Sequence, residues 1–132
     1  MSKNSNRKMK LELEYSVRSS PHILFQYISN PSGLQSWFAD HVEILGAGDY
    51  RFSWEDGTEN VAKMVKNVTN KYTRFEFDGG NDGEYLEFRI EQDEITGDVE
   101  LIIVEFVNEA EAQMAASIWD SAVEDLCAII GA

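Results

Sequence analysis

The residues best suited to nucleophilic or acid–base chemistry in this sequence are two histidines and a single cysteine, namely His22, His41 and Cys127. A catalytic nucleophile needs a base within hydrogen-bond reach. We expect His22, in the first turn of an expected helix, and His41, at the start of an expected strand, to face solvent. Cys127 falls beside Leu126 in an apolar helical stripe, which predicts a buried and unreactive thiol. The sequence therefore predicts neither hydrolytic nor thiol chemistry, and we expect that the protein is not an enzyme.

Metal and phosphate sites are not predicted either. The segment Asp-Gly-Gly-Asn-Asp-Gly, from Asp78 to Gly83, is similar to the start of a calcium-binding loop. Such a loop needs a bidentate glutamate at its twelfth position, which here is Arg89, so we interpret the segment as a turn. No group of cysteines and histidines has metal-ligand spacing, and no glycine-rich segment joins a strand to a helix as a phosphate-binding loop requires. We expect no cofactor.

In the expected strand 99–107, Glu105 is the one acidic residue inside the otherwise apolar run that follows Glu100, residues 101–107. If its side chain faces a cavity, it can anchor a hydroxyl or an amine of a ligand, and burial would raise the pKa of its carboxyl group. If the residue lies instead at a strand end that reaches water, it has no such role. The apolar residues on both sides of it leave the direction of its side chain open.

Charge is distributed very unevenly along the chain. The formal net charge is −13. Residues 1–74 hold ten Lys/Arg and eight Asp/Glu, whereas residues 75–132 hold one Arg, Arg89, and sixteen Asp/Glu. Nucleic acids and anionic membrane surfaces are bound by clusters of Lys and Arg, and no basic stretch of the chain is long enough. We therefore expect no nucleic-acid partner and interpret the acidity as a solvated surface, with a dedicated site for a basic partner as the alternative.

Membrane insertion is not expected, because no apolar run approaches the roughly 20 residues that a membrane-spanning helix needs. The first eight residues carry charge with no apolar block behind them, so nothing indicates export. A single cysteine forms no internal disulfide and is compatible with a reducing compartment. The sequence predicts a cytoplasmic protein.

The first part of the chain predicts one strand and two short helices. Apolar and polar residues alternate over residues 10–18, as in a strand with one buried face. Ser20 followed by Pro21 is typical of a helix start, and this helix must stop before Asn30-Pro31. A second short helix is expected from Leu34 to Phe38.

Six further strands and one long helix follow. The strands are expected at residues 42–45, 50–55, 60–69, 72–77, 84–92 and 99–107, bounded by turn residues such as Asp56-Gly57. The long helix begins near Asn108, with Asn108 and Glu111 as a variant capping box, and ends at Gly131. Its apolar stripe consists of Ala115, Ile118, Trp119, Ala122, Leu126 and Ile130.

This order of elements predicts an α+β fold in which a seven-stranded, antiparallel, curved sheet wraps around the C-terminal helix. At 132 residues the chain fits one domain, residues 1–132, in which we expect residues 1–9 to form a disordered tail. A sheet bent around one helix encloses space, so the fold predicts a pocket.

The chain resembles the START-like, or helix-grip, superfamily from about Lys10 onward. Within it the chain is most similar to small bacterial proteins related to activators of the heat-shock chaperone ATPase. The resemblance rests on the order of elements and on Ser20-Pro21, Leu34-x-x-Trp37, Asp56-Gly57 and the segment from Thr73 to Phe77. Between the fourth and fifth strands this chain has Val68-Thr69-Asn70-Lys71, where such proteins commonly have proline.

The resemblance implies a cavity between the sheet and the C-terminal helix that holds an apolar or amphipathic molecule. Aromatic side chains are suited to such a wall, although they also fill cores. The candidate ligand-binding residues are Trp37, Phe52, Trp54, Met64, Phe75, Phe77, Phe88, Glu105, Trp119 and Ala122.

Three functions remain open at this point. The first is binding of a lipid-like molecule or metabolite in the cavity. The second is a protein-interaction module that acts as a chaperone co-factor, as the resemblance allows. The third is an enzyme similar to the polyketide cyclases of the same superfamily. An enzyme would need a cluster of polar residues at inward strand positions, and the strands assigned here hold almost none.

Overall fold

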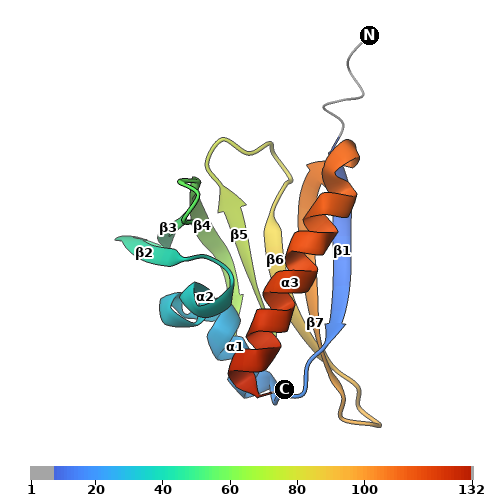
Figure 1. Cartoon of the computed structure of the whole chain (residues 1–132). Coiled ribbons are helices and arrows are strands. Elements are labelled where there is room, and N and C mark those ends of the chain that lie inside the picture. Colours follow the sequence, from blue (N-terminus) through green and yellow to red (C-terminus); the bar gives the residue numbers. More distant parts are fainter. Residues whose placement is uncertain (1–7, 132) are drawn as a thin grey trace.

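The computed structural model describes residues 8–131, which form a curved sheet with the helices on one side of it (Figure 1). The elements in chain order are β1 (Lys8–Ser16), α1 (Pro21–Ser29), α2 (Pro31–Trp37), β2 (His41–Gly46), β3 (Asp49–Ser53), β4 (Glu59–Val68), β5 (Tyr72–Phe77), β6 (Leu86–Gln92), β7 (Val99–Asn108), the short 3-10 helix η2 (Glu109–Glu111) and α3 (Ala112–Ile130).

The sheet has seven strands in the order β1-β7-β6-β5-β4-β3-β2, and every neighbouring pair is antiparallel. The first strand therefore lies beside the last, while β1 and β2 form opposite edges. Because α1 and α2 stand between β1 and β2 in the chain, they carry it from one edge of the sheet to the other. The helix α3 crosses the concave face (Figure 1). The predicted α+β fold of a curved antiparallel sheet around a C-terminal helix is confirmed.

The first strand begins and ends earlier than predicted. Its residues Lys8 and Met9 pair with Asn108 and Val107 of β7, so these two residues belong to the sheet and not to the expected tail. The rest of that tail, residues 1–7, lies outside the described residues. β6 also begins later than predicted, at Leu86, because the preceding glycine-rich turn extends to Glu84, whose N–H donates to the carbonyl of Asn81 at 3.1 Å.

The start of α1 is as the sequence predicts. The Ser20 hydroxyl accepts a hydrogen bond from the Ile23 N–H at 3.1 Å, and Pro21 occupies the first turn. Asn30 has an extended backbone and separates α1 from α2. The two helices meet closely at Gly33, where a Cβ would lie 2.1 Å from the carbonyl oxygen of Gln26. This contact holds α2, and the Phe38 that follows it, against the core.

The start of α3 differs from the prediction. Asn108 is followed by the 3-10 turn η2, and α3 begins only at Ala112. The Asn108 amide donates to the Glu111 carboxylate at 3.3 Å instead of accepting a backbone N–H, so the predicted capping box is wrong. The tighter 3-10 turn places the two side chains against each other. The predicted end is confirmed, because Gly131 has a φ of 84°, which glycine adopts without a Cβ penalty.

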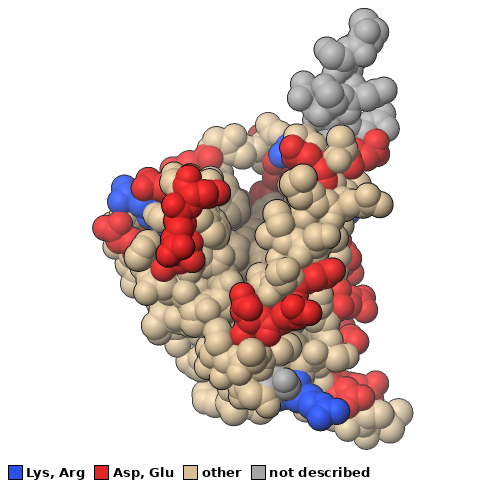
Figure 2. Space-filling view, in the orientation of Figure 1, with Lys and Arg blue, Asp and Glu red and all other residues tan. Residues whose placement is uncertain are grey.

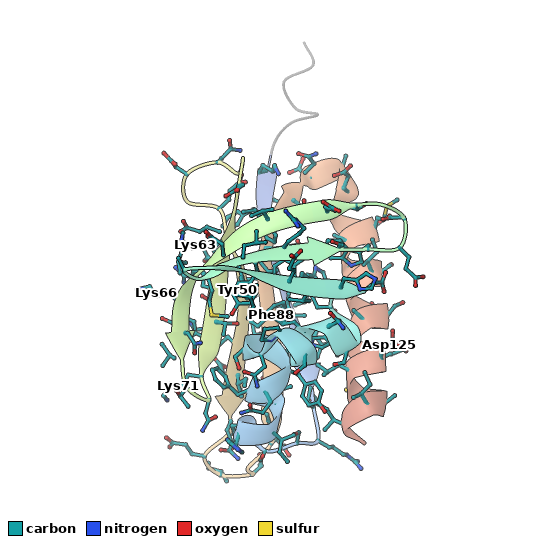
Figure 3. The ribbon with its side chains drawn as sticks, turned by 90° about the vertical axis from the view of Figure 1, so that its left-hand side faces the viewer. Tyr50, Lys63, Lys66, Lys71, Phe88 and Asp125 are labelled. Atoms are coloured by element: carbon teal, nitrogen blue, oxygen red, sulfur yellow. The ribbon has the colours of Figure 1, made fainter. Side chains whose placement is uncertain are left out.

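The core lies between the concave face of the sheet and the three α-helices. Phe52, Phe75 and Phe88 are fully buried on β3, β5 and β6. The ring centroid of Phe75 lies 5.6 Å from that of Phe52 and 6.3 Å from that of Phe88. Every second residue of these strands points inward, as their alternation predicts. Figure 3 shows Phe88 in the interior, Lys63, Lys66 and Lys71 on the outer side of the sheet, and Asp125 on the side of α3.

One side of α3 packs on this core through Trp119, Val123 and Leu126. The prediction that Ile118 belongs to the buried stripe is wrong, since its side chain is 62% exposed. Ile118 lies at an opening beside the helix. On the opposite side of α3, the Tyr15 hydroxyl of β1 donates to the Asp120 carboxylate at 2.7 Å and fixes the helix relative to the sheet edge.

The outer face of the sheet explains why β7 is apolar on both sides. Leu101 and Ile103 face the core, whereas Ile102 and Val104 lie on the outer face, beside Arg89 and Glu87 of β6 in the register. Side chains of the sheet itself cover these two residues. Glu87 is almost fully buried there, with its carboxylate oxygens 2.7 Å from Arg74 and 3.0 Å from Arg89.

Tyrosines complete this outer cluster. The Arg74 guanidinium lies 4.1 Å from the centre of the Tyr85 ring, and that of Arg89 lies 4.3 Å from the centre of the Tyr72 ring. A buried carboxylate is stable only when charged partners and hydrogen bonds replace water, and the two arginines supply both. The direction of every β7 side chain follows from this arrangement, so that Glu105 faces inward with Leu101 and Ile103.

The packing of α3 predicts that Leu126 is essential for stability. Leu126→Ala should lower the free energy of unfolding by about 2–5 kcal/mol, because it leaves a cavity under a fully buried side chain. Ile129→Ala, at a position of the same helix that is 46% exposed, should change it by no more than about 0.5 kcal/mol. Urea denaturation of both variants measures the difference, and equal effects would contradict the described orientation of α3.

Candidate functional site

A cavity of about 380 Å³ lies between the concave face of the sheet and α3. Strands, α3 and the segment after α2 all contribute to its wall. The lining residues are Phe38, Trp54, Asn60, Phe77, Leu86, Glu105, Ala115, Ile118, Trp119 and Ala122. The space exists because Ala115 and Ala122 are small on the side of α3 that faces the sheet, where larger side chains would fill it.

One wall of the cavity is aromatic and firmly held. The rings of Phe38 and Trp119 stack at 5.7 Å between centroids, and Phe38 meets Trp54 edge to face at 5.6 Å. The indole N–H of Trp54 donates to the carbonyl of Phe38 at 3.0 Å. These contacts fix the rings before any ligand arrives, so binding would not require the wall to become ordered.

The carboxylate of Glu105 is the charged group of the lining. Its Oε2 accepts a hydrogen bond from the indole N–H of Trp119 at 2.6 Å. Burial raises the pKa of the Glu105 carboxyl above its ordinary value, while the Trp119 N–H and the charge of Lys8 act in the opposite direction. Of the two orientations left open by the sequence, the structure has the one in which Glu105 faces the cavity.

The predicted site residues divide into two groups. Trp54, Phe77, Glu105, Trp119 and Ala122 line the cavity together. The others lie elsewhere in the core: Trp37, Phe52, Phe75 and Phe88 are buried beneath the wall, and Met64 is half-buried on β4. Inward direction alone does not separate these groups, because the cavity occupies only one end of the concave face.

Five lining residues are absent from the predicted site: Phe38, Asn60, Leu86, Ala115 and Ile118. Leu86 is in an alternating strand and Ala115 is in the apolar stripe of the helix, so their positions carried a signal that could have identified them. Phe38 and Asn60 carried none, since one follows a short helix and the other begins a strand. Only the close packing of α1 and α2 places Phe38 over the cavity.

A groove next to the cavity shares Phe38, Trp54, Ile118 and Ala122 with it. The carboxylates of Asp40 and Asp125 line this groove. Figure 2 shows the hollow between α3 and the β2–β4 side of the molecule, with Asp and Glu on both sides and Lys and Arg only near the margins of this face. The approach to the cavity is therefore acidic.

The other residues considered for chemistry lie outside the cavity. His22 and His41 are exposed, as predicted. Cys127 is half-buried rather than buried, and burial raises the pKa of its thiol, which keeps it protonated at neutral pH. Among residues 8–131, no three His, Cys, Asp or Glu side chains gather in a way that could hold a metal ion. Within the same residues, no helix is long and apolar enough to span a bilayer.

A curved antiparallel sheet that grips a C-terminal helix over a cavity defines the helix-grip class of proteins. The chain belongs to the START-like superfamily, since the model of the START-like superfamily domain matches residues 5–132. The family predicted from the order of elements is therefore confirmed. No curated protein matches the sequence.

Several solved structures are similar to this chain. A Bacteroides fragilis protein solved by NMR is 34% identical over 91% of this chain and 89% of its own, with a TM-score of 0.64. The Aha1 dimer of Colwellia psychrerythraea is 19% identical over 90% of this chain and 93% of its own, with a TM-score of 0.71. A Mesorhizobium loti protein is 12% identical over 93% of this chain and 97% of its own, with a TM-score of 0.76. The last two similarities are similarities of fold.

The raised pKa of Glu105 predicts a pH-dependent effect on stability. In the unfolded chain the carboxyl has its ordinary value of 4.5, whereas in the folded protein the value is higher. The contribution of Glu105 to the stability of the fold is therefore fully present at a pH below its ordinary pKa, and it is lost as the pH rises through the pKa in the folded protein. Glu105→Gln, which keeps an oxygen for the Trp119 N–H, should raise the melting temperature at neutral pH, and the gain should shrink in acid.

Thermal melts from acidic to neutral pH measure this effect. The matched control is Glu94→Gln, in the exposed loop between β6 and β7, which removes one charge away from the cavity and should show no such trend. A Glu105→Gln variant that is less stable than the wild type at neutral pH would contradict the assignment, because the hydrogen bond would then outweigh the cost of burial.

Proposed function

We propose that this protein binds one apolar or amphipathic small molecule in the cavity between the sheet and α3. The observation that carries the proposal is the cavity itself, which combines an apolar, largely aromatic lining with two polar side chains, Asn60 and Glu105. Its volume of about 380 Å³ falls in the range typical of small-molecule sites. A preformed aromatic wall supplies contact area, and a few polar groups supply orientation.

The alternative functions receive less support. A cyclase-like enzyme would need acid, base or nucleophilic groups together at the cavity, and its lining has Glu105 and Asn60 as its polar members. A chaperone co-factor would need a continuous docking surface. The large exposed apolar side chains of the described residues are instead distributed over several elements: Ile23 on α1, Ile44 and Leu45 on β2, Val68 on β4, Ile95 in the loop before β7, and Met114, Ile118 and Ile129 on α3. The similarity to the Aha1 dimer is one of fold and supports no partner.

We further propose that the protein acts in the cytoplasm, where its single cysteine would stay reduced. The acidic side of the molecule that carries the cavity opposes the approach of nucleic acids and anionic membranes. A small molecule that reaches the cavity through the aqueous phase fits these conditions.

Octanol, a neutral amphiphile, tests the proposal. It should bind with a stoichiometry near one and change tryptophan emission, because Trp54 and Trp119 lie in the wall. Ala122→Phe should weaken this binding by about tenfold or more, since the new ring occupies the cavity. The matched control is Ser121→Phe, which adds the same ring at the adjacent exposed position and should bind octanol as the wild type does.

Calorimetric titration and tryptophan fluorescence measure both variants, with a thermal melt to show that each is folded. Absence of saturable octanol binding to the wild type, or equal binding by a folded Ala122→Phe protein, would remove the support for a ligand in this cavity.

A further inference from the structure

The carboxylate of Glu105, which lines the cavity, has hydrogen-bonding capacity left over. Its Oε2 accepts from the Trp119 N–H, while Oε1 takes part in no hydrogen bond or ion pair with the described residues. Lys8, whose charge acts on Glu105, has its ammonium 4.0 Å from the Glu84 carboxylate and does not line the cavity. An ionised carboxylate only accepts hydrogen bonds, so a ligand group that meets Oε1 must be a donor.

The charges around the cavity favour a cationic donor over a neutral or anionic one. No Lys, Arg or His is among the lining residues, and Asp40 and Asp125 line the neighbouring groove that shares residues with the cavity. Lys63, Lys66 and Lys71 are on the outer side of the sheet, away from the cavity (Figure 3). A carboxylate ligand would meet a second carboxylate at Glu105, and the two could share the site only by binding a proton.

The aromatic wall also favours a cationic ligand. The faces of Trp and Phe rings carry partial negative charge and attract cations. Either an ammonium or a hydroxyl would form a charge-assisted hydrogen bond with an ionised Oε1, but only the ammonium adds an attraction between opposite charges, which is stronger where water is partly excluded. An ammonium group at Oε1 would therefore gain more binding free energy than a hydroxyl group in the same place.

We propose that the natural ligand is an amine with an apolar body, bound as its cation, with the ammonium group at Glu105 and the apolar part against Phe77, Leu86 and the aromatic wall. This inference rests on the proposed function and specifies the chemical class of the ligand. It assigns Glu105 as the residue that determines specificity, with Trp119 as the residue that positions its carboxylate.

The experiment compares octylamine, octanol and octanoate, which share one alkyl chain and differ in the head group. At neutral pH the wild type should bind octylamine about tenfold more tightly than octanol, and octanoate more weakly than both. Glu105→Gln should reduce the ratio of octylamine to octanol affinity to about one. The control Glu94→Gln removes the same single negative charge and should keep the wild-type ratio. Calorimetry gives all of these affinities.

A further variant excludes binding of octylamine to surface carboxylates. Ala122→Phe should remove octylamine binding together with octanol binding, and octylamine binding that persists in this variant would overturn the inference. Octanol binding with no preference for octylamine, or a ratio that Glu105→Gln leaves unchanged, would also overturn it while leaving the proposed function standing. Failure of all three compounds to bind would overturn both.

Discussion

The structure depends on the position of Trp119, which links the helix, the sheet and the cavity. Its ring packs against Trp37, Phe38 and Phe88, with centroids 5.7 to 6.2 Å away, while its N–H donates to Glu105 on β7. Aromatic pairs of this kind each contribute about 0.5–1.5 kcal/mol beyond the area that they bury. Because one side chain contacts α2, β6 and β7, the rotation and the height of α3 over the sheet are set together. A change at this residue would therefore alter the fold and the cavity at once.

The outer face of the sheet determines what the inner face can present. Glu87 and its two arginines cover Ile102 and Val104. The apolar residues on the outer face of β7 are therefore shielded from water without a second layer of helices or strands. With those residues outside, Leu101, Ile103 and Glu105 necessarily face the helix, since successive residues of a strand point to opposite faces. The ion pairs on one face thus fix the carboxylate on the other. This coupling makes the orientation of Glu105 a property of the whole sheet.

Much of the fold could be predicted from the sequence because its signals are local. Alternation locates most strands, Ser20-Pro21 begins α1, and Gly131 ends α3. The site could be predicted only in part, because its determinants are tertiary. The direction of β7 depends on Arg74 and Arg89 from other positions in the sheet, Phe38 reaches the cavity through the contact of α1 with α2, and Ile118 is exposed because the helix covers only part of a concave surface. Periodicity within one segment contains none of this information.

The cavity is a departure from the packing that stability alone would select. Protein cores are close-packed, and replacing Ala115 or Ala122 by larger side chains would bury more apolar area against Phe77 and Leu86. An acidic residue at an inward position adds a further cost, since burial penalises the charged form of Glu105. The chain nevertheless keeps small residues on α3, a carboxylate opposite them and a hydrogen bond that fixes one of its oxygens. Costs of this kind are expected where a site must stay open for a ligand, because the ligand then supplies the contacts that the empty protein lacks.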